Sequence, residues 1–432
     1  MQKIRVMVVE DSSVVRRVLV EEINGQPDML VSETAANGRI ALDKMALSVP
    51  DLVILDIEMP ELDGLATLEP LRKLAPRVPV IMFSSLTDLG AAATLEALAR
   101  GATDFFAKPK SQGGLDSSRQ LIRAELIPAI RTLAGGRSDA LPPPTASRPP
   151  TAFTSASFGM AATPSVPSAA SLPAAAIPAG SISAASLPAG SISAAAASAA
   201  TAASPSSAAA AAKSGSIAAS PPAVTSVNRE SSFTTSPLVR LDVVAIGAST
   251  GGPNAFADLF QSLGGDLPVP IVIAQHMPPG FTRMLAERLS KVSRIPTFEA
   301  ADNVELEPGK AWIAPGDFHM TVVRDGARVR LRTNQEPPEH GCRPAVDPLF
   351  RSVAKTFGAN TLAIVLTGMG QDGLRGAEAI RAANGQVFAQ DQASSVVWGM
   401  PGFVARAGLA DRVLPLSLMA AEILRRLKVG RG

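Results

Sequence analysis

The chain has 432 residues, which is too long for one ordinary hydrophobic core and predicts two or three folding units. Its 40 lysines and arginines balance 38 aspartates and glutamates, so no large basic field is available to hold nucleic acid or an anionic membrane. One cysteine, Cys342, excludes an internal disulfide, and neither a signal-peptide pattern nor an apolar run of about 20 residues is present. We therefore expect a cytoplasmic protein without membrane insertion.

The first 125 residues alternate apolar runs with amphipathic stretches. The apolar runs begin at Ile4, Asp51 and Pro79, and a short final run covers 104–108. Such runs are typical of strands buried on both faces of a parallel sheet. Strands that alternate with helices predict a doubly wound sheet, in which ligands gather at the carboxyl ends of the strands.

Polar residues follow each of these predicted strands. They are Glu10, Asp11, Asp56, Ser84 and Lys108. Clustered carboxylates at one sheet edge suit Mg²⁺, and Asp56 would then attack a phosphoryl group while the metal and Lys108 neutralise the developing charge. Taken singly, each residue is better explained as a solvated loop start, so the hypothesis depends on the whole set.

The segments VVEDSS, LDIEMPELDG, FSS and FFAKP resemble the response-regulator receiver family over residues 1–125. The resemblance implies a flavodoxin-like sheet of five parallel strands and phosphorylation of Asp56 by a chemotaxis histidine kinase. It implies that Mg²⁺ is held by Glu10, Asp11, Asp56 and the backbone carbonyl of Glu58. It also implies that Ser84, Phe105 and Lys108 are the switch residues. Phe105 lacks the hydroxyl of the commoner tyrosine, so its signalling would depend on packing alone.

Residues 126–237 comprise the end of a helix and then a segment of a different composition. From about Arg137 to Pro237 the chain is almost entirely alanine, serine, proline, glycine and threonine. Such a segment cannot bury enough apolar surface to offset the entropy of ordering its backbone. We predict a disordered linker between two separately folding blocks.

The last block, 238–430, repeats the alternation of strands and helices. Strands are predicted at 241–247, 270–276, 311–315 and 362–368, and 320–332 is predicted to form a hairpin that turns at Asp325 and Gly326. This pattern predicts a three-layer, doubly wound α/β/α domain whose sheet is mainly parallel with an antiparallel hairpin.

Ser249 lies in the sequence Gly247-Ala-Ser-Thr-Gly-Gly, between an apolar strand and a helical pattern, which is the setting of a nucleophile elbow. The alternative is a glycine-rich phosphate loop, but Pro253 follows and neither GKS, GKT nor GxGxxG is present. His276 ends the next parallel strand and is the natural general base, whereas His319 and His340 lie in the hairpin and a polar loop.

The acid that orients this histidine should lie at a third strand end, and Asp372 meets that requirement. Its neighbours TGMG offer backbone N–H groups for an oxyanion hole. A standard α/β-hydrolase places the acid before the histidine, which would select Ser249, Asp302 or Asp317, and His340. That alternative draws its acid and its histidine from loops.

The segments GASTGGP, AQHMPPGFT, APGDFHM, RPAVDPLF and LTGMGQDG resemble the catalytic domain of chemotaxis protein-glutamate methylesterases. The resemblance implies a triad of Ser249, His276 and Asp372, with the backbone N–H of Met369 in the oxyanion hole. It further suggests a substrate groove lined by Thr250, Met277 and Arg283. We expect the esterase to need no cofactor.

The resemblance implies that the protein removes methyl esters from glutamates of methyl-accepting chemoreceptors, releases methanol, and deamidates selected receptor glutamines during adaptation. It also implies that the unphosphorylated receiver packs over the catalytic cleft. We expect a monomer. Two alternatives remain open at this point: the same esterase in a non-flagellar chemosensory pathway, and a non-catalytic adaptor in which the receiver switches a binding domain.

Overall fold

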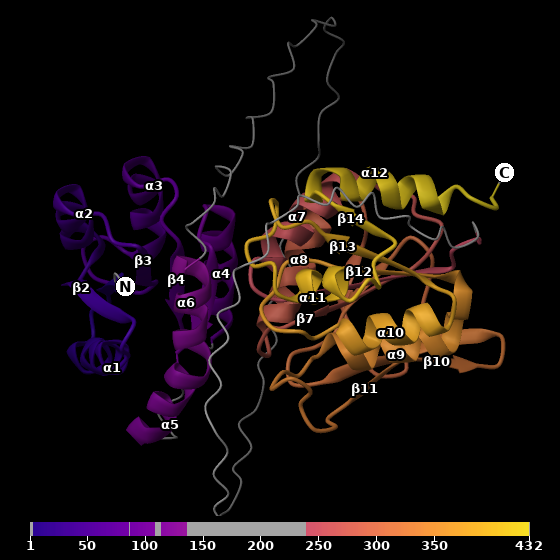
Figure 1. Cartoon of the computed structure of the whole chain (residues 1–432), viewed down its shortest axis with the longest axis horizontal. Helices are drawn as coiled ribbons and strands as arrows, with labels where there is room; N and C mark the ends of the chain where they lie inside the picture. Colours follow the sequence, from indigo (N-terminus) through magenta and orange to yellow (C-terminus); the bar gives the residue numbers. More distant parts are fainter. Residues whose placement is uncertain (1–2, 86, 109–113, 136–238, 432) are drawn as a thin grey trace, which may run out of the picture. The chain divides into compact units, whose positions relative to one another are not determined.

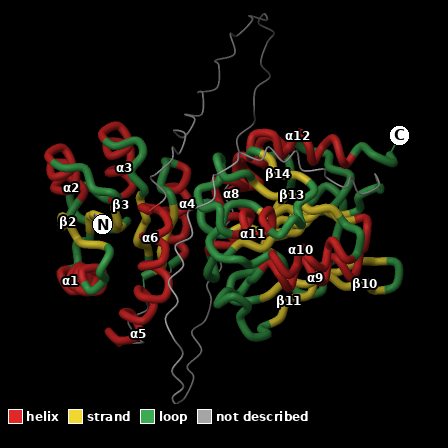
Figure 2. Tube along the Cα trace, in the orientation of Figure 1, coloured by secondary structure: helices red, strands yellow, loops and turns green. Residues whose placement is uncertain are grey.

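The computed structural model describes residues 3–85, 87–108, 114–135 and 239–431, which form an N-terminal and a C-terminal α/β domain (Figures 1 and 2). The linker predicted between Arg137 and Pro237 lies outside these residues. Within the described part of the chain, no helix is both long and apolar enough to cross a membrane.

The N-terminal domain contains a sheet of five parallel strands in the order β2-β1-β3-β4-β5. The strands are β1 (Ile4–Val9), β2 (Met29–Ala35), β3 (Leu52–Asp56), β4 (Val80–Ser84) and β5 (Asp104–Ala107). The helical segments are α1 (Ser13–Asn24), α2 (Gly38–Leu47), α3 (Gly64–Leu74), α4 (Asp88–Ala99), α5 (Gly114–Leu121), η2 (Ile122–Leu126) and α6 (Ile127–Gly135).

Successive side chains of β1 enter two different cores because side chains alternate across a strand. Val6 and Val8 pack with α1, η2 and α6, while Met7 and Val9 pack with α2, α3 and α4. Helices therefore cover both faces of the sheet. The strand order and this layering confirm the predicted flavodoxin-like fold.

The C-terminal domain contains a sheet of seven strands in the order β14-β13-β12-β6-β7-β9-β8, and every pair is parallel. Its strands are β6 (Val243–Ala248), β7 (Ile271–Gln275), β8 (Thr297–Glu299), β9 (Ala311–Ile313), β12 (Thr361–Val365), β13 (Gln386–Gln390) and β14 (Arg412–Leu414). β6 comes first in the chain yet lies between β12 and β7. The strand order reverses there, which is where a crevice opens at the carboxyl ends of such a sheet.

Two helical layers enclose this sheet. The first comprises α7 (Gly252–Leu263), α8 (Phe281–Val292) and α12 (Leu416–Leu427), which share a core with Val244 and Ile246 of β6. The second comprises α9 (Val346–Phe357), α10 (Leu374–Ala382) and α11 (Met400–Arg406), which share a core with Val243 and Ala245. These layers confirm the predicted three-layer α/β/α architecture.

The hairpin differs from the prediction in its position. β10 (His319–Asp325) and β11 (Arg328–Asn334) form their own two-stranded antiparallel sheet and do not extend the main one. The hairpin packs against α9, and the backbone N–H of Val322 donates to Ser352 Oγ at 2.9 Å. Asp325 pairs with Arg328, so the connecting residues are Gly326 and Ala327, one residue later than predicted. The left-handed φ of 60° at Gly326 explains this turn, because glycine adopts it without strain.

Candidate functional site

Ser249 follows β6 directly, and Thr250 and Gly251 separate it from Gly252, the first residue of α7. Gly251 has a left-handed φ of 77°, and a β-carbon on Gly252 would overlap Oε1 of Gln275. Both positions therefore require glycine for the chain to turn sharply into the helix. The turn keeps its shape through hydrogen bonds from Ser249 N to Thr367 O at 3.0 Å and from Gly252 N to Ser249 O at 2.8 Å.

His276 follows β7 at the position that matches Ser249 on the neighbouring strand. Ala248 pairs with Gln275, and the backbone N–H of His276 donates to Ala248 O at 3.2 Å. The side-chain amide of Gln275 donates to the carbonyl oxygens of Ser249 at 3.0 Å and of His276 at 3.2 Å. Sheet register thus brings the predicted nucleophile and base together. The imidazole of His276 is hydrogen-bonded to the carboxylate of Asp372. Among the described residues, no hydrogen bond joins this imidazole to the hydroxyl of Ser249.

Asp372 lies 2.7 Å from Nε2 of His276 through Oδ2 and is only 1% exposed. Its carboxylate accepts three backbone N–H bonds, from Val346 at 2.6 Å, Asp347 at 2.9 Å and Gly373 at 2.8 Å. Val346 and Asp347 begin α9, so the free N–H groups and the positive end of that helix face the acid. Burial raises the pKa of Asp372, but His276 and these N–H groups outweigh it, and the pKa falls below its usual value.

His276 is the electrostatic partner of that carboxylate. Burial lowers its pKa, whereas the hydrogen bond to Asp372 and the contact with the thiol of Cys342 raise it, and the net shift is upward. A general base must be neutral to accept a proton. The pair of His276 and Asp372 therefore sets the lower pH limit of any reaction that Ser249 initiates.

The residues of the alternative triad are engaged in other contacts. Asp302 pairs with Arg332 at 3.3 Å, and Asp317 pairs with Arg343 at 2.6 Å. His340 bonds to Asp347 at 2.8 Å. His319 is buried, and its ring contacts the backbone of Ala345 and Pro337, which is a structural role. The geometry therefore favours Asp372 as the acid.

The remaining predicted residues of the esterase lie around this centre. Thr250 and Met277 are buried and Arg283 is exposed, so only Arg283 presents its side chain at the surface in this conformation. Met369 is partly buried, and its Sδ accepts a hydrogen bond from Thr132 of α6 at 3.4 Å. The roles of Met369 in the oxyanion hole and of the other three in a groove stay predictions.

Sequence reasoning missed three residues that support the elbow, namely Thr367, Gln275 and Gln390. Thr367 Oγ1 donates to Thr250 O at 2.9 Å, and its backbone N–H donates to Oε1 of Gln390 at 2.8 Å. Gln275 and Gln390 each end a buried strand whose other residues are apolar. A polar side chain at the last position of an apolar run was the signal that could have identified both.

The receiver domain gathers its acidic residues at the carboxyl ends of β1 and β3. The ammonium of Lys108 lies 2.8 Å from Asp56 Oδ2 and 3.1 Å from Glu10 Oε2. Both oxygens are buried and neither has a well-aligned hydrogen bond, so the lysine neutralises charge without satisfying them. Ligand atoms of Glu10, Asp11 and Asp56 lie within 4.8 Å of one another. Oxygen ligands with free lone pairs in this arrangement fit Mg²⁺.

Burial and mutual repulsion disfavour the charged forms of Glu10 and Asp56. Burial is the main reason that the pKa of Glu10 rises from 4.5 to about 7, and the nearby charge of Asp56 adds to it. Burial also raises the pKa of Asp56, against the opposing effect of Lys108. Burial lowers the pKa of Lys108, but the two carboxylates outweigh it and the net pKa is raised. A divalent cation would relieve the repulsion between the two acids.

The other predicted receiver residues are placed as follows. Ser84 is buried and its hydroxyl donates to the carbonyl of Gly90 at 3.1 Å, at the start of α4. The backbone N–H of Glu58 donates to Asp56 Oδ1 at 3.3 Å, which puts residue 58 beside the predicted phosphoacceptor. Phe105 stacks on Phe281 of α8 with ring centroids 4.8 Å apart. Their roles in metal binding and switching stay predictions.

A receiver joined to an α/β domain with a serine at an elbow, a histidine on the adjacent strand and a buried aspartate defines a class of receiver-linked serine hydrolases. Two family models match the chain: the response regulator receiver domain over residues 6–118 and the CheB methylesterase over residues 244–423. The chain is 41% identical to the protein-glutamate methylesterase/protein-glutamine glutaminase of Trichodesmium erythraeum, over 99% of this chain and 100% of that protein. It belongs to the protein-glutamate methylesterase/protein-glutamine glutaminase family.

Further relatives agree. The protein-glutamate methylesterase/protein-glutamine glutaminase of a Nocardioides species is 41% identical over 99% of this chain and 96% of its own length. The crystal structure of the Thermotoga maritima CheB methylesterase catalytic domain is 40% identical, covers 43% of this chain and 99% of its own, and gives a TM-score of 0.42. The full-length relatives and the two family models confirm the predicted family and enzyme class, and the strand order of the two sheets confirms the predicted fold class.

Replacement of the acid by its amide tests the triad. The neutral amide of Asp372→Asn no longer stabilises the charged imidazole of His276, so burial should lower the pKa of His276. We expect kcat to drop by about 10³- to 10⁴-fold. Ester hydrolysis and an NMR titration of His276 measure the two effects. Asp302→Asn, which alters the acid of the alternative triad, is the matched control. An Asp372→Asn enzyme of normal activity would remove Asp372 from the triad.

The raised pKa of Glu10 predicts how pH and Mg²⁺ act on the receiver. A carboxyl with a raised pKa stabilises the fold below its ordinary value of 4.5, and this contribution is lost as pH rises through about 7. Added Mg²⁺ should therefore raise the melting temperature more at about pH 7.5 than at about pH 5. Glu10→Gln should abolish most of this difference, whereas Glu58→Gln, which keeps the backbone carbonyl, should preserve it. An equal Mg²⁺ effect at both pH values would contradict the assignment.

Proposed function

We propose that this chain hydrolyses γ-glutamyl methyl esters of methyl-accepting chemoreceptors and deamidates selected receptor glutamines, under control of receiver phosphorylation. The printed names of its full-length relatives support this substrate class. The single observation that carries the proposal is the 2.7 Å bond between His276 and Asp372, made beside Ser249 on the adjacent strand. Receptors of this kind place the protein in the cytoplasm, where we propose that it acts as a monomer without a nucleic-acid partner.

The chemistry follows from these three side chains. His276 takes the hydroxyl proton as Ser249 Oγ attacks the ester carbonyl carbon, and Asp372 stabilises the imidazolium. The backbone N–H of Met369 would donate to the oxyanion. The carbonyl re-forms, methoxide leaves with the proton from His276 as methanol, and an acyl-enzyme remains. Water then attacks the acyl carbon with His276 again as base, which releases glutamate and restores the serine.

Deamidation uses the same atoms with a different leaving group. A glutamine side chain presents an amide carbonyl to Ser249, and the proton on His276 passes to the departing nitrogen, which leaves as ammonia. The acyl-enzyme is identical to that formed from the ester, so its hydrolysis also yields glutamate. One site therefore serves both reactions, and neither needs a cofactor in this proposal.

In the receiver, we propose that a histidine kinase donates a phosphoryl group to Asp56. Glu10, Asp11, Asp56 and the Glu58 carbonyl would hold Mg²⁺, which supplies positive charge to the transferring phosphoryl oxygens. Lys108 already contacts Asp56 and would neutralise the product. The hydroxyl of Ser84 would exchange its bond with Gly90 O for one with a phosphoryl oxygen.

Contacts between receiver and esterase residues support a route for control. Besides the stacking of Phe105 on Phe281, the side-chain amide of Asn254 in α7 donates to Leu98 O of α4 at 2.9 Å. Phe281 begins α8, five residues after His276. We propose that these contacts restrain the unphosphorylated enzyme and that movement of Phe105 after phosphorylation of Asp56 weakens them.

Removal of the proposed nucleophile separates an enzyme from a non-catalytic adaptor. Ser249→Ala should abolish methanol release from methylated receptor membranes and labelling by a serine-reactive phosphonate, because it removes the hydroxyl that follows β6 beside His276. Ser262→Ala, on the exposed side of the same helix α7, is the control and should retain both. Undiminished hydrolysis by Ser249→Ala would refute the proposal, and a wild-type protein that fails to release methanol would favour the adaptor.

Removal of the stacked ring tests control by the receiver. Phe105→Ala should raise methanol release by the unphosphorylated protein several-fold, because the contact with Phe281 is lost, and should leave the phosphorylated rate unchanged. Leu89→Ala, an exposed apolar residue of α4, should change neither rate. If Phe105→Ala leaves the unphosphorylated rate at its wild-type value, Phe105 is not part of the restraint.

A further inference from the structure

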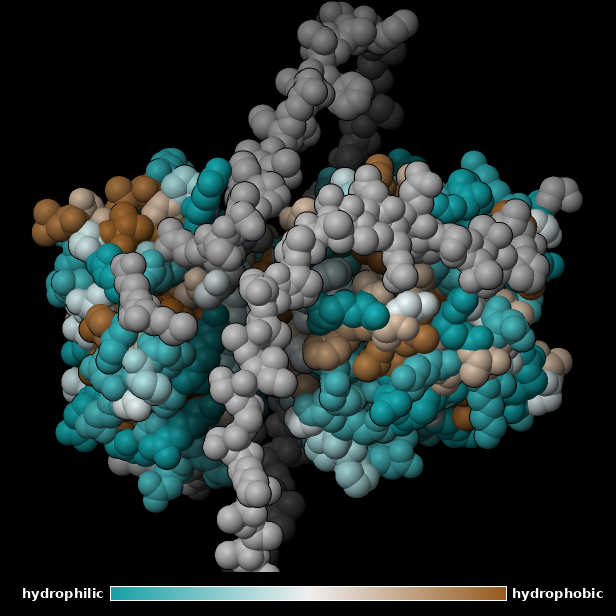
Figure 3. All heavy atoms as spheres, in the orientation of Figure 1, coloured by the Kyte–Doolittle hydropathy of each residue, from teal (hydrophilic) through white to brown (hydrophobic). Residues whose placement is uncertain are grey.

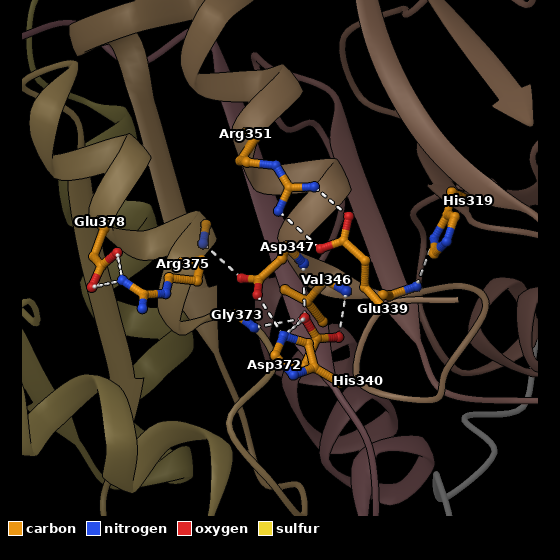
Figure 4. Close-up of polar contacts among 12 residues, drawn as sticks. His319, Glu339, His340, Val346, Asp347, Arg351, Asp372, Gly373, Arg375 and Glu378 are labelled. Atoms are coloured by element: carbon orange, nitrogen blue, oxygen red, sulfur yellow. Dashed lines mark hydrogen bonds and ion pairs between the residues drawn. The ribbon is translucent and has the colours of Figure 1, made fainter. Parts of the chain in front are cut away.

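A second imidazole–carboxylate pair lies directly behind the acid of the triad. Asp347 is 1% exposed, and its Oδ2 lies 2.8 Å from Nε2 of His340 (Figure 4). The same imidazole nitrogen lies 3.9 Å from Oδ1 of Asp372. His340 comes from the loop before α9 and Asp347 from the first turn of that helix. His340 is thus a cation, when protonated, that faces two buried carboxylates.

The two aspartates bind each other's helices. Asp372 precedes α10 and accepts the N–H groups of Val346 and Asp347 at the start of α9. Asp347 belongs to α9 and accepts the N–H of Gly376 in the first turn of α10 at 2.6 Å. A β-carbon on Gly376 would collide with Phe350, so glycine is needed for this approach. These reciprocal hydrogen bonds between α9 and α10 fix the position of the Asp372 carboxylate relative to both helices.

The two buried carboxylates influence each other's ionisation. Burial is the main cause of a raised pKa at Asp347, and the nearby charge of Asp372 adds to it. The ionisable groups that face the pair are His276 and Asp372 at the strand ends, Cys342 and Glu339 in the loop, Arg351 on α9 and Arg375 on α10. Arg351 is engaged with Glu339, and Arg375 with Glu378. His340 is therefore the basic side chain in direct contact with Asp347 among the described residues.

A metal site is the competing explanation, because one ligand atom each from Glu339, His340 and Asp347 lies within 4.8 Å of the others. Both oxygens of Glu339 are bound to Arg351, at 3.0 and 2.5 Å. Asp347 already accepts from Gly376 and His340. Since each of these groups already has a hydrogen-bond partner within the protein, the structure favours a hydrogen-bonded pair of His340 and Asp347 over a metal site.

We propose that His340 and Asp347 are positioning residues of the esterase: together they hold the carboxylate of Asp372 in place and balance its charge, and thereby tune His276. This inference rests on the proposed triad of Ser249, His276 and Asp372. Removal of the cation leaves excess negative charge beside His276, and removal of the carboxylate leaves excess positive charge. The two changes must act on His276 in opposite directions.

The test is the pH profile of kcat/KM for methanol release by the full chain in four variants. His340→Gln should move the acid limb to higher pH by at least about half a unit, and Asp347→Asn should move it to lower pH by a similar amount. The double variant should return close to the wild-type profile because both charges are gone. Glu307→Gln, which removes an exposed charge outside this set of ionisable groups, should leave the limb in place.

Asp347→Asn retains an oxygen that can accept from Gly376, so the fold should persist, and thermal melting of each variant checks this. Shifts in the same direction, an unmoved acid limb in both single variants, or losses of kcat that follow only the melting temperature would overturn the inference. Ser249→Ala separates it from the proposed function. If that variant is inactive while His340→Gln and Asp347→Asn keep the wild-type profile, the triad stands and only the positioning pair fails.

Discussion

The esterase domain depends on one buried carboxylate held at the start of a helix. Asp372 would be costly to bury as a free anion, and the N–H groups of Val346 and Asp347 together with His276 make its burial tolerable. This requires α9 to begin directly beside β6. Gly247 of β6 permits it, because a β-carbon there would overlap the side chain of Val346. The strand, the helix and the acid therefore constrain one another.

The fold could be predicted from the sequence where a strand is buried on both faces. Runs such as VVAIGA and IVIAQ have no other stable location, and sheet register then brought Ser249 beside His276. Shorter edge strands carry too little pattern: β8 and β14 have three residues each, and both lie at the sheet edges. The hairpin was recognised from its alternation, but nothing in that alternation indicated that it would pack on α9.

The same reasoning explains what was missed around the triad. A residue at the end of a parallel strand has a predictable neighbour, whereas His340 lies in a loop with a left-handed φ of 54° and Asp347 lies in the first turn of a helix. Their contact depends on how the loop enters α9 and how α9 meets α10. Sequence spacing carries no information on either, so the pairing of His340 with Asp347 could not be predicted.

The two domains treat buried carboxylates in opposite ways, and the difference matches what each must do. In the esterase, His276 and peptide N–H groups satisfy the carboxylate of Asp372, and its pKa lies below its usual value. In the receiver, Lys108 contacts Glu10 and Asp56 but leaves one oxygen of each without an aligned donor, and their pKa values rise. A residue that must only orient a base benefits from complete satisfaction. For Asp56 as the proposed phosphoacceptor, an oxygen without an aligned donor is an advantage, because a cation and the phosphoryl oxygens could then supply the contacts that the unphosphorylated fold lacks.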